Sequence, residues 1–118
     1  MVTIELTDEE AKESREMLKA VIKPLERSIA ATDLGHRDYR QFLKNRRALV
    51  DELIKRLEKM LTIELTDEEA KESVAMLKDA IPVLERSIAA TDLGHRDYRQ
   101  FLKNRRALVD ELIKRLEK

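Results

Sequence analysis

The chain has 118 residues, and its 24 basic and 24 acidic residues leave a formal net charge of zero. No global charge therefore attracts nucleic acid or an anionic membrane, and the absence of cysteine excludes disulfides and thiolate chemistry. The low content of glycine and proline, with 41% charged residues, is typical of a long-helix protein of one domain's size. We expect a cytoplasmic or recombinant cytosolic product, because the sequence shows neither a signal peptide nor an apolar run of ~18 residues.

The sequence is one unit written twice. Residues 1–59 recur as residues 60–118 with seven substitutions, of which six fall between Arg15 and Pro24. Because most surface positions tolerate substitution, natural drift would have scattered the changes along the whole unit. We interpret the chain as an engineered tandem copy that was edited on purpose in one stretch, and a very recent natural duplication is the alternative.

Each copy begins with a predicted extended leader and a first helix. Val2, Ile4 and Leu6 alternate with polar residues, which predicts a short strand-like segment that lays three apolar side chains on the protein. Thr7 and Glu10 form a capping-box pattern, so the first helix is expected to begin near Asp8. The leader of the second copy carries Leu61, Ile63 and Leu65. The expected apolar stripe of the first helix is Ala11, Leu18, Val21, Ile22, Leu25 and Ile29.

A hairpin turn is predicted at residues 32–35, where Gly35 is able to take a positive φ angle. The second helix then runs from about His36 to Glu58. Its predicted stripe is Tyr39, Phe42, Leu43, Leu49, Val50, Leu53 and Leu57, and sheet content is expected to be negligible.

The link at residues 60–65 is too short to travel back along a helix of ~33 Å. We therefore predict an all-α, up-down-up-down four-helix bundle made of two tandem α-hairpins, residues 1–59 and residues 60–118, which share one core. An exchange of halves between two tandem chains is the alternative, so the predicted state is a monomer or a dimer of the tandem chain.

The edited stretch is the first candidate for function. In the second copy it replaces charged residues by an apolar strip around Asp79, which is the composition of a partner-binding surface. The predicted partner-binding residues are Val74, Ala75, Asp79, Pro82 and Val83. The competing interpretation is that the edits adjust packing or break the symmetry of the bundle.

Two further features are predicted to be structural. Pro24 and Pro82 lie inside the first helices of the two copies, displaced by one position, and are expected to kink them in different directions. Arg46 and its repeat Arg105 fall in the middle of an apolar stripe and require a partner, for which Glu26 is the nearest candidate for Arg46. We favour this structural role over anion binding.

Other polar groups are weaker candidates. A basic strip of Arg37, Arg40, Lys44 and Arg47 is interleaved with acids, and the chain contains no recognised nucleic-acid motif, so we expect no nucleic-acid partner. His36 and His95 at the turns are interpreted as solvated capping residues rather than metal ligands. Nothing pairs a nucleophile with a base, so we expect no catalytic residues, no metal, no cofactor and no enzymatic activity.

Each unit resembles a group of short bacterial helical-hairpin proteins of unassigned function. The resemblance rests on an apolar leader followed by Leu6, Thr7, Glu9, Glu10 and Ala11. It continues through Ile29, Ala30, Thr32 and Asp33, and through Tyr39, Arg40, Leu43, Lys44 and Arg46. It implies a hairpin fold and a homodimer of hairpins, which a single-chain duplication would mimic.

Two functions therefore remain open from the sequence. The first is an engineered non-enzymatic four-helix-bundle scaffold or protein-binding module with its partner surface on the edited helix. The alternative is a purely structural single-chain version of a homodimeric hairpin protein, with no designed ligand. A catalyst placed inside the bundle is the least favoured hypothesis.

Overall fold

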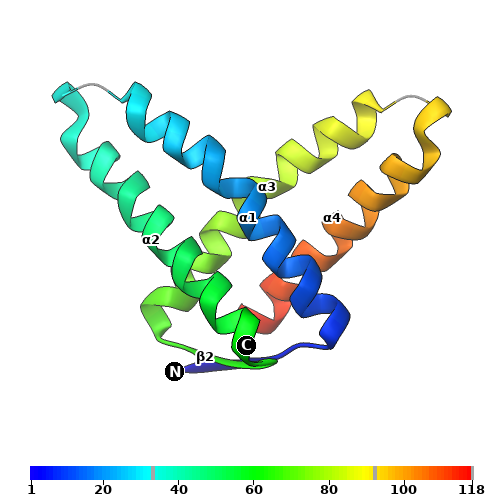
Figure 1. Cartoon of the computed structure of the whole chain (residues 1–118), viewed down its shortest axis with the longest axis horizontal. Helices are drawn as coiled ribbons and strands as arrows, with labels where there is room; N and C mark the ends of the chain where they lie inside the picture. Colours follow the sequence, from blue (N-terminus) through cyan, green and yellow to red (C-terminus); the bar gives the residue numbers. More distant parts are fainter. Residues whose placement is uncertain (33, 92, 118) are drawn as a thin grey trace. The chain divides into compact units, whose positions relative to one another are not determined.

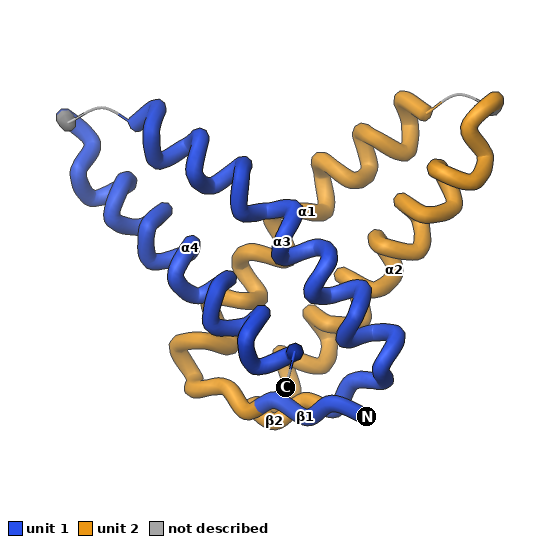
Figure 2. The backbone as a smooth tube through the Cα atoms, turned by 180° about the vertical axis from the view of Figure 1, so that it is seen from behind, with its two compact units in different colours: residues 1–4, 64–118 blue, residues 5–63 orange. Residues whose placement is uncertain are grey.

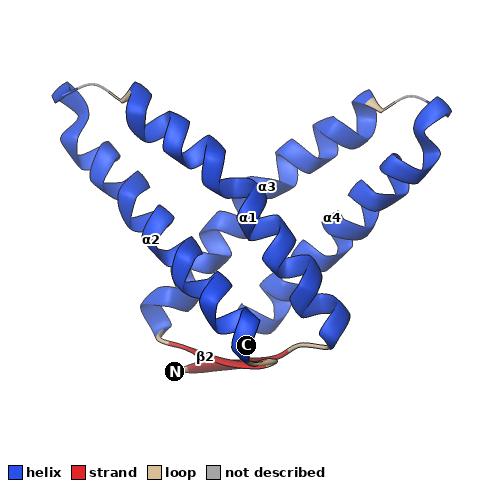
Figure 3. Cartoon of the chain, viewed as in Figure 1, coloured by secondary structure: helices blue, strands red, loops and turns tan. Residues whose placement is uncertain are grey.

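The computed structural model describes residues 1–32, 34–91 and 93–117, and its regular structure is almost entirely helical (Figures 1 and 3). In chain order the described elements are β1 (Val2–Glu5), α1 (Asp8–Ala31), the 3-10 turn η1 (Leu34–His36), α2 (Arg37–Lys59), β2 (Thr62–Leu65), α3 (Asp67–Ala90), the 3-10 turn η2 (Leu93–His95) and α4 (Arg96–Glu117). Helix α1 packs against α2, and α3 packs against α4. The predicted all-α fold of two tandem α-hairpins with short extended leaders is confirmed.

The first helix of each hairpin begins at the predicted capping box. The Thr7 hydroxyl accepts a hydrogen bond from the Glu10 amide at 3.1 Å, and the Glu10 carboxylate accepts one from the Thr7 amide at 3.0 Å. Thr66 and Glu69 repeat both bonds at 3.0 Å. These bonds satisfy backbone donors that have no partner inside the helix, which explains why both helices begin where the pattern predicts.

The described part of each hairpin turn contains a 3-10 turn and no left-handed glycine. The α1 helix ends at Ala31, and the amide and hydroxyl of the next residue, Thr32, both donate to the Ser28 carbonyl, at 3.1 and 2.6 Å. Gly35 then lies inside η1, and no glycine among the described residues has a positive φ. Gly35 is able to take a positive φ but does not do so here, because a 3-10 turn has ordinary backbone angles. Asp33 and Asp92, which belong to the predicted turns, lie outside the described residues.

Most of the buried side chains belong to the predicted stripes, which did not include Ile54 or its repeat Ile113. On α2 the buried apolar residues are Leu43, Val50, Leu53, Ile54 and Leu57, and on α4 they are Leu102, Val109, Leu112, Ile113 and Leu116. On α1 only Ala11 and Leu25 of the predicted stripe are buried, and its other members are half-buried.

Two stripe predictions on α2 were wrong. Tyr39 and Phe42 are 56% and 40% exposed, and their repeats Tyr98 and Phe101 are 55% and 38% exposed. Both lie in the first turns of α2, next to the hairpin turn. Periodicity identifies a face of a helix but not how far along the helix that face is covered, so the stripe was extended too far.

The leaders pair with each other in a two-stranded sheet, β1–β2, which the sequence did not predict. Ile4, Leu6, Ile63 and Leu65 are buried as expected from the alternation, whereas Val2 is half-buried and Leu61 is 41% exposed, contrary to the expectation for Leu61. The sheet is short, so the expectation of negligible sheet content fails only for these leaders.

The chain divides into two compact units, and the division falls inside both strands (Figure 2). Unit 2 is Glu5–Ile63, which holds α1 and α2. Unit 1 combines Met1–Ile4 with Glu64–Lys118, which holds α3 and α4. The first residues of the chain are thus grouped with the second hairpin, where the terminal amine of Met1 lies 3.2 Å from the Asp67 carboxylate. The grouping of residues 1–59 and 60–118 into one bundle with a common core stays a prediction.

None of the four helices described over residues 1–32, 34–91 and 93–117 combines the length and the apolar character that a bilayer crossing requires.

Candidate functional site

The edited residues of the second copy lie on α3 and divide into two groups by exposure. Asp79, Pro82 and Val83 are exposed, with Val83 at 54%, whereas Val74 and Ala75 are half-buried. Positions 75, 79, 82 and 83 are spaced by threes and fours, so they share one face of the helix. The strip of Asp79, Pro82 and Val83, here called the α3 strip, therefore presents two apolar side chains beside one carboxylate.

Both interior prolines lie on exposed positions of uninterrupted helices. Pro24 is inside α1 and Pro82 is inside α3, and each helix continues for at least seven residues beyond its proline. A proline has no amide hydrogen, so the carbonyl four residues earlier loses its helical donor. In α3 that carbonyl belongs to Lys78, next to the strip. The predicted difference in kink direction stays a prediction.

Arg15, the first edited position, has a defined role in unit 2. Its Nη1 atom donates to the carbonyl of Leu57 at 3.1 Å, and the side chain is half-buried. Leu57 lies in the last turn of α2, where carbonyl groups have no helical donor and the helix dipole favours a cation. Arg15 thus fastens the start of α1 to the end of α2.

Unit 1 holds a pocket of about 380 Å³ at the corresponding place. Its apolar lining comes from Val2, Ala70, Val74 and Leu116, and its charged lining comes from Asp67, Lys71, Lys78 and Glu117. Lys78 Nζ and Glu117 Oε2 form an ion pair at 3.2 Å on its rim. Val74 occupies the position that Arg15 occupies in the first copy, and valine has no donor to offer the Leu116 carbonyl.

Two substitutions that are far apart in the sequence line this pocket together. Val2 is the one position outside the edited stretch that differs between the copies, its counterpart being Leu61. Because Met1–Ile4 belongs to unit 1, Val2 lines the same pocket as Val74. Sequence analysis missed this site, although the isolated substitution at Val2 was a signal that a leader position mattered.

Arg46 is 9% exposed, and its guanidinium carbon lies 4.6 Å from the centroid of the Phe42 ring. The Phe42 ring in turn stacks on Tyr39, with centroids 6.0 Å apart. Arg105, Phe101 and Tyr98 repeat the arrangement, although Arg105 is only half-buried. A guanidinium over an aromatic face is attracted by the ring quadrupole. Phe42 and Phe101 are therefore favourable neighbours for Arg46 and Arg105, although both rings are apolar.

Glu26, the candidate partner of Arg46, accepts a hydrogen bond from Arg47 Nη2 at 3.3 Å. Arg47 Nη1 also forms an ion pair with Asp51. The hydrogen bond to Asp51 is the main cause that raises the pKa of Arg47, with Glu26 adding to it and desolvation opposing it. Arg106 repeats this arrangement with Asp110 and Glu85. One member of the basic strip in each copy is thus engaged by acids of its own hairpin.

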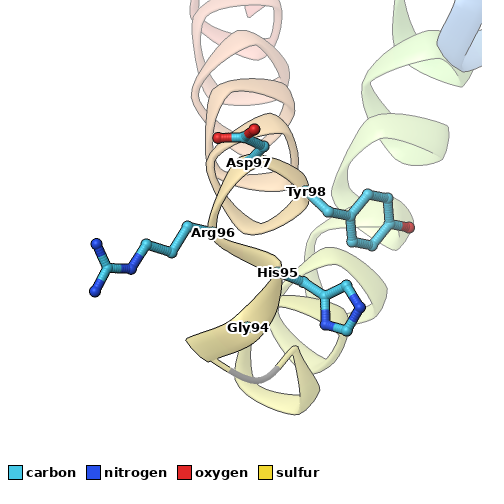
Figure 4. A pocket seen from close by; sticks show the side chains of 5 residues that line it. All are labelled: Gly94, His95, Arg96, Asp97 and Tyr98. Carbon is cyan, nitrogen blue, oxygen red and sulfur yellow. The ribbon is translucent and has the colours of Figure 1, made fainter.

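The second hairpin turn carries another hollow, of about 570 Å³, which is lined by Gly94, His95, Arg96, Asp97 and Tyr98 (Figure 4). All five residues are consecutive and exposed. The Arg96 side chain points to the opposite side from His95 and Tyr98, so the polar groups do not converge (Figure 4). Within the described part of the chain, no group of three histidine, aspartate or glutamate side chains is placed to hold a metal ion.

Comparison with family models, curated proteins and solved structures found no match to this chain.

Proposed function

We propose that the chain is an engineered, non-enzymatic four-helix scaffold or protein-binding module whose partner surface is the edited face of α3. The observation that carries the proposal is the exposure of the α3 strip. Val83 is 54% exposed and Pro82 is exposed, where the first copy carries Pro24 and Lys23. Two of the three edited residues on this surface are apolar, and exposed apolar side chains beside a polar group are characteristic of interaction sites.

The backbone of α3 adds a polar element to the same surface. Pro82 removes the helical donor of the Lys78 carbonyl, and Lys78 directly precedes Asp79 in the chain. A partner that covers Val83 gains apolar contact, and a donor on that partner finds both a carboxylate and a carbonyl nearby. We expect Val83 and Asp79 to carry most of the affinity, because a few central residues usually dominate an interface.

A selection experiment with a matched control tests the proposal. A displayed random peptide library is selected against the full chain and then against a variant in which α3 carries the residues of the first copy: V74R, A75E, D79A, A80V, P82K and V83P. We expect selected peptides that bind the original chain, fail on the reverted variant and weaken by at least about tenfold on V83A or D79A. Peptides that bind both chains equally, with V83A and D79A unchanged, would refute a partner surface on this face.

The grouping of the leaders favours a second candidate, a single-chain version of a homodimeric hairpin protein without a designed ligand. Met1–Ile4 is grouped with the second hairpin and Glu5–Ile63 with the first, as expected where two copies of one hairpin exchange their leading strands. This candidate predicts that a peptide of residues 1–59 alone is a dimer. A monomeric peptide in light scattering would argue against it.

A further inference from the structure

The pocket in unit 1 and the Arg15 site in unit 2 are the same place in the two copies with different occupants. Arg15 lies at this site in unit 2 and donates to the Leu57 carbonyl at 3.1 Å. In unit 1 the counterparts are Val74 and Leu116, and the pocket of about 380 Å³ lies between them. The flanking lysine and glutamate are retained: Lys19 and Glu58 are 4.0 Å apart in unit 2, and Lys78 and Glu117 are 3.2 Å apart in unit 1. The site in unit 1 therefore keeps the flanking ion pair but lacks the guanidinium that Arg15 supplies in unit 2.

The leader residue at this site, Val2, is also smaller than its counterpart in the other copy. Val2 lines the pocket in unit 1, and its repeat Leu61 in unit 2 is larger by one methylene group. Two of the seven positions that differ between the copies thus meet here, and both place the smaller side chain in unit 1. The substitutions enlarge one space instead of compensating for each other.

We propose that this pocket binds an alkylguanidinium group, the side chain of an arginine supplied by a partner protein. The guanidinium would donate to the Leu116 carbonyl in the last turn of α4, where the helix dipole favours a cation. Val2, Ala70 and Val74 would cover the methylene groups of that side chain, since a long basic side chain lays its stem along apolar surface. The biological source of this arginine rests on the proposed function, whereas the pocket is testable without any partner.

The test uses N-propylguanidinium as the probe and the amide NMR signals of the full chain as the readout. We expect saturable shifts at Val74, Lys78 and Leu116, with half-saturation at roughly millimolar probe for a ligand of this size. The V74R variant supplies its own guanidinium and should lose the response by at least about tenfold. Propylammonium is the matched control, because it carries the same charge and alkyl chain but lacks the planar set of N–H donors of a guanidinium. It should give much weaker shifts.

A converse variant should create a second site. R15V combined with L61V empties the counterpart in unit 2, and we expect a second set of saturable shifts at Lys19 and Leu57. A linear drift without saturation in the original chain, an undiminished response in V74R, or equal binding of propylammonium would each overturn the inference. Should R15V/L61V fail to fold, the V74R comparison decides alone.

The two proposals fail independently. Loss of probe binding with peptide binding intact on the α3 strip would leave the proposed function standing without the arginine pocket. If the probe binds but no selected peptide depends on Val83 or Asp79, the arginine pocket stands and the partner surface on the α3 strip is refuted.

Discussion

The clearest prediction about stability concerns the exchange of Arg15 and Val74. The Arg15 hydrogen bond to Leu57 is half-buried and has a charged donor, which places its net contribution near the lower end of ~1.5–3 kcal/mol. The favourable position at a helix C-terminus adds about 0.5 kcal/mol, and ordering a half-buried arginine costs about 1 kcal/mol. We therefore expect R15V to lower the free energy of unfolding by about 1 kcal/mol and V74R to raise it by a similar amount.

Calorimetry measures this difference. Unfolding 118 residues as one transition carries an entropy of about 0.25 kcal/mol/K, so a change of 1 kcal/mol moves Tm by about 4 °C, and by about twice as much if one hairpin unfolds alone. Amide exchange locates the effect, because R15V should speed exchange in the last turn of α2 and V74R should slow it in the last turn of α4. Shifts of Tm in the same direction for both variants would refute the reasoning, since it requires opposite signs.

Three other predictions follow from single contacts. The buried hydroxyls of Ser14 and Ser73 have no hydrogen-bond partner in the described part of the chain, so S14A and S73A should each raise the urea-derived free energy of unfolding by about 1 kcal/mol; a decrease would contradict this. T7A and T66A remove the cap of α1 or α3 and should each cost about 1 kcal/mol in the same assay, whereas an unchanged urea midpoint would show that the caps contribute little. The raised pKa of Arg47 means that its charge stabilises the fold fully below the ordinary arginine pKa and loses that effect only as pH rises through the higher folded-state value. The difference in urea midpoint between the original chain and R47M should thus stay constant from neutral pH to about pH 11, and a fall near pH 9 would disprove the assignment.

The elements with strong local signals were predictable from the sequence. The capping boxes at Thr7 and Thr66 placed the starts of α1 and α3 correctly, because each box satisfies its own backbone donors without help from distant residues. The alternation of Ile4 and Leu6 likewise indicated which leader side chains are buried.

Features that depend on distant contacts were not predictable. The hydrogen bond between Glu26 and Arg47 was not predicted, since one residue turns a side chain by about 100° around the helix and only the packing of two helices decides which arginine faces Glu26. Tyr39 and Phe42 are 56% and 40% exposed because the described residues cover their part of the stripe only partly, which periodicity does not report. The pocket at Val74 required knowing that Val2 belongs to the other hairpin's unit.

Because Met1–Ile4 is grouped with the second hairpin, a label attached to Met1 would report on that hairpin. The amine of Met1 is held beside Asp67 at the start of α3, 66 positions further along the chain. A fluorophore attached there would follow events at the second hairpin while leaving the first unmonitored. Trimming residues 1–4 would likewise uncover Ala70 and Val74 and leave Ala11 and Arg15 in place, so the cut and its damage would lie in different halves of the polypeptide.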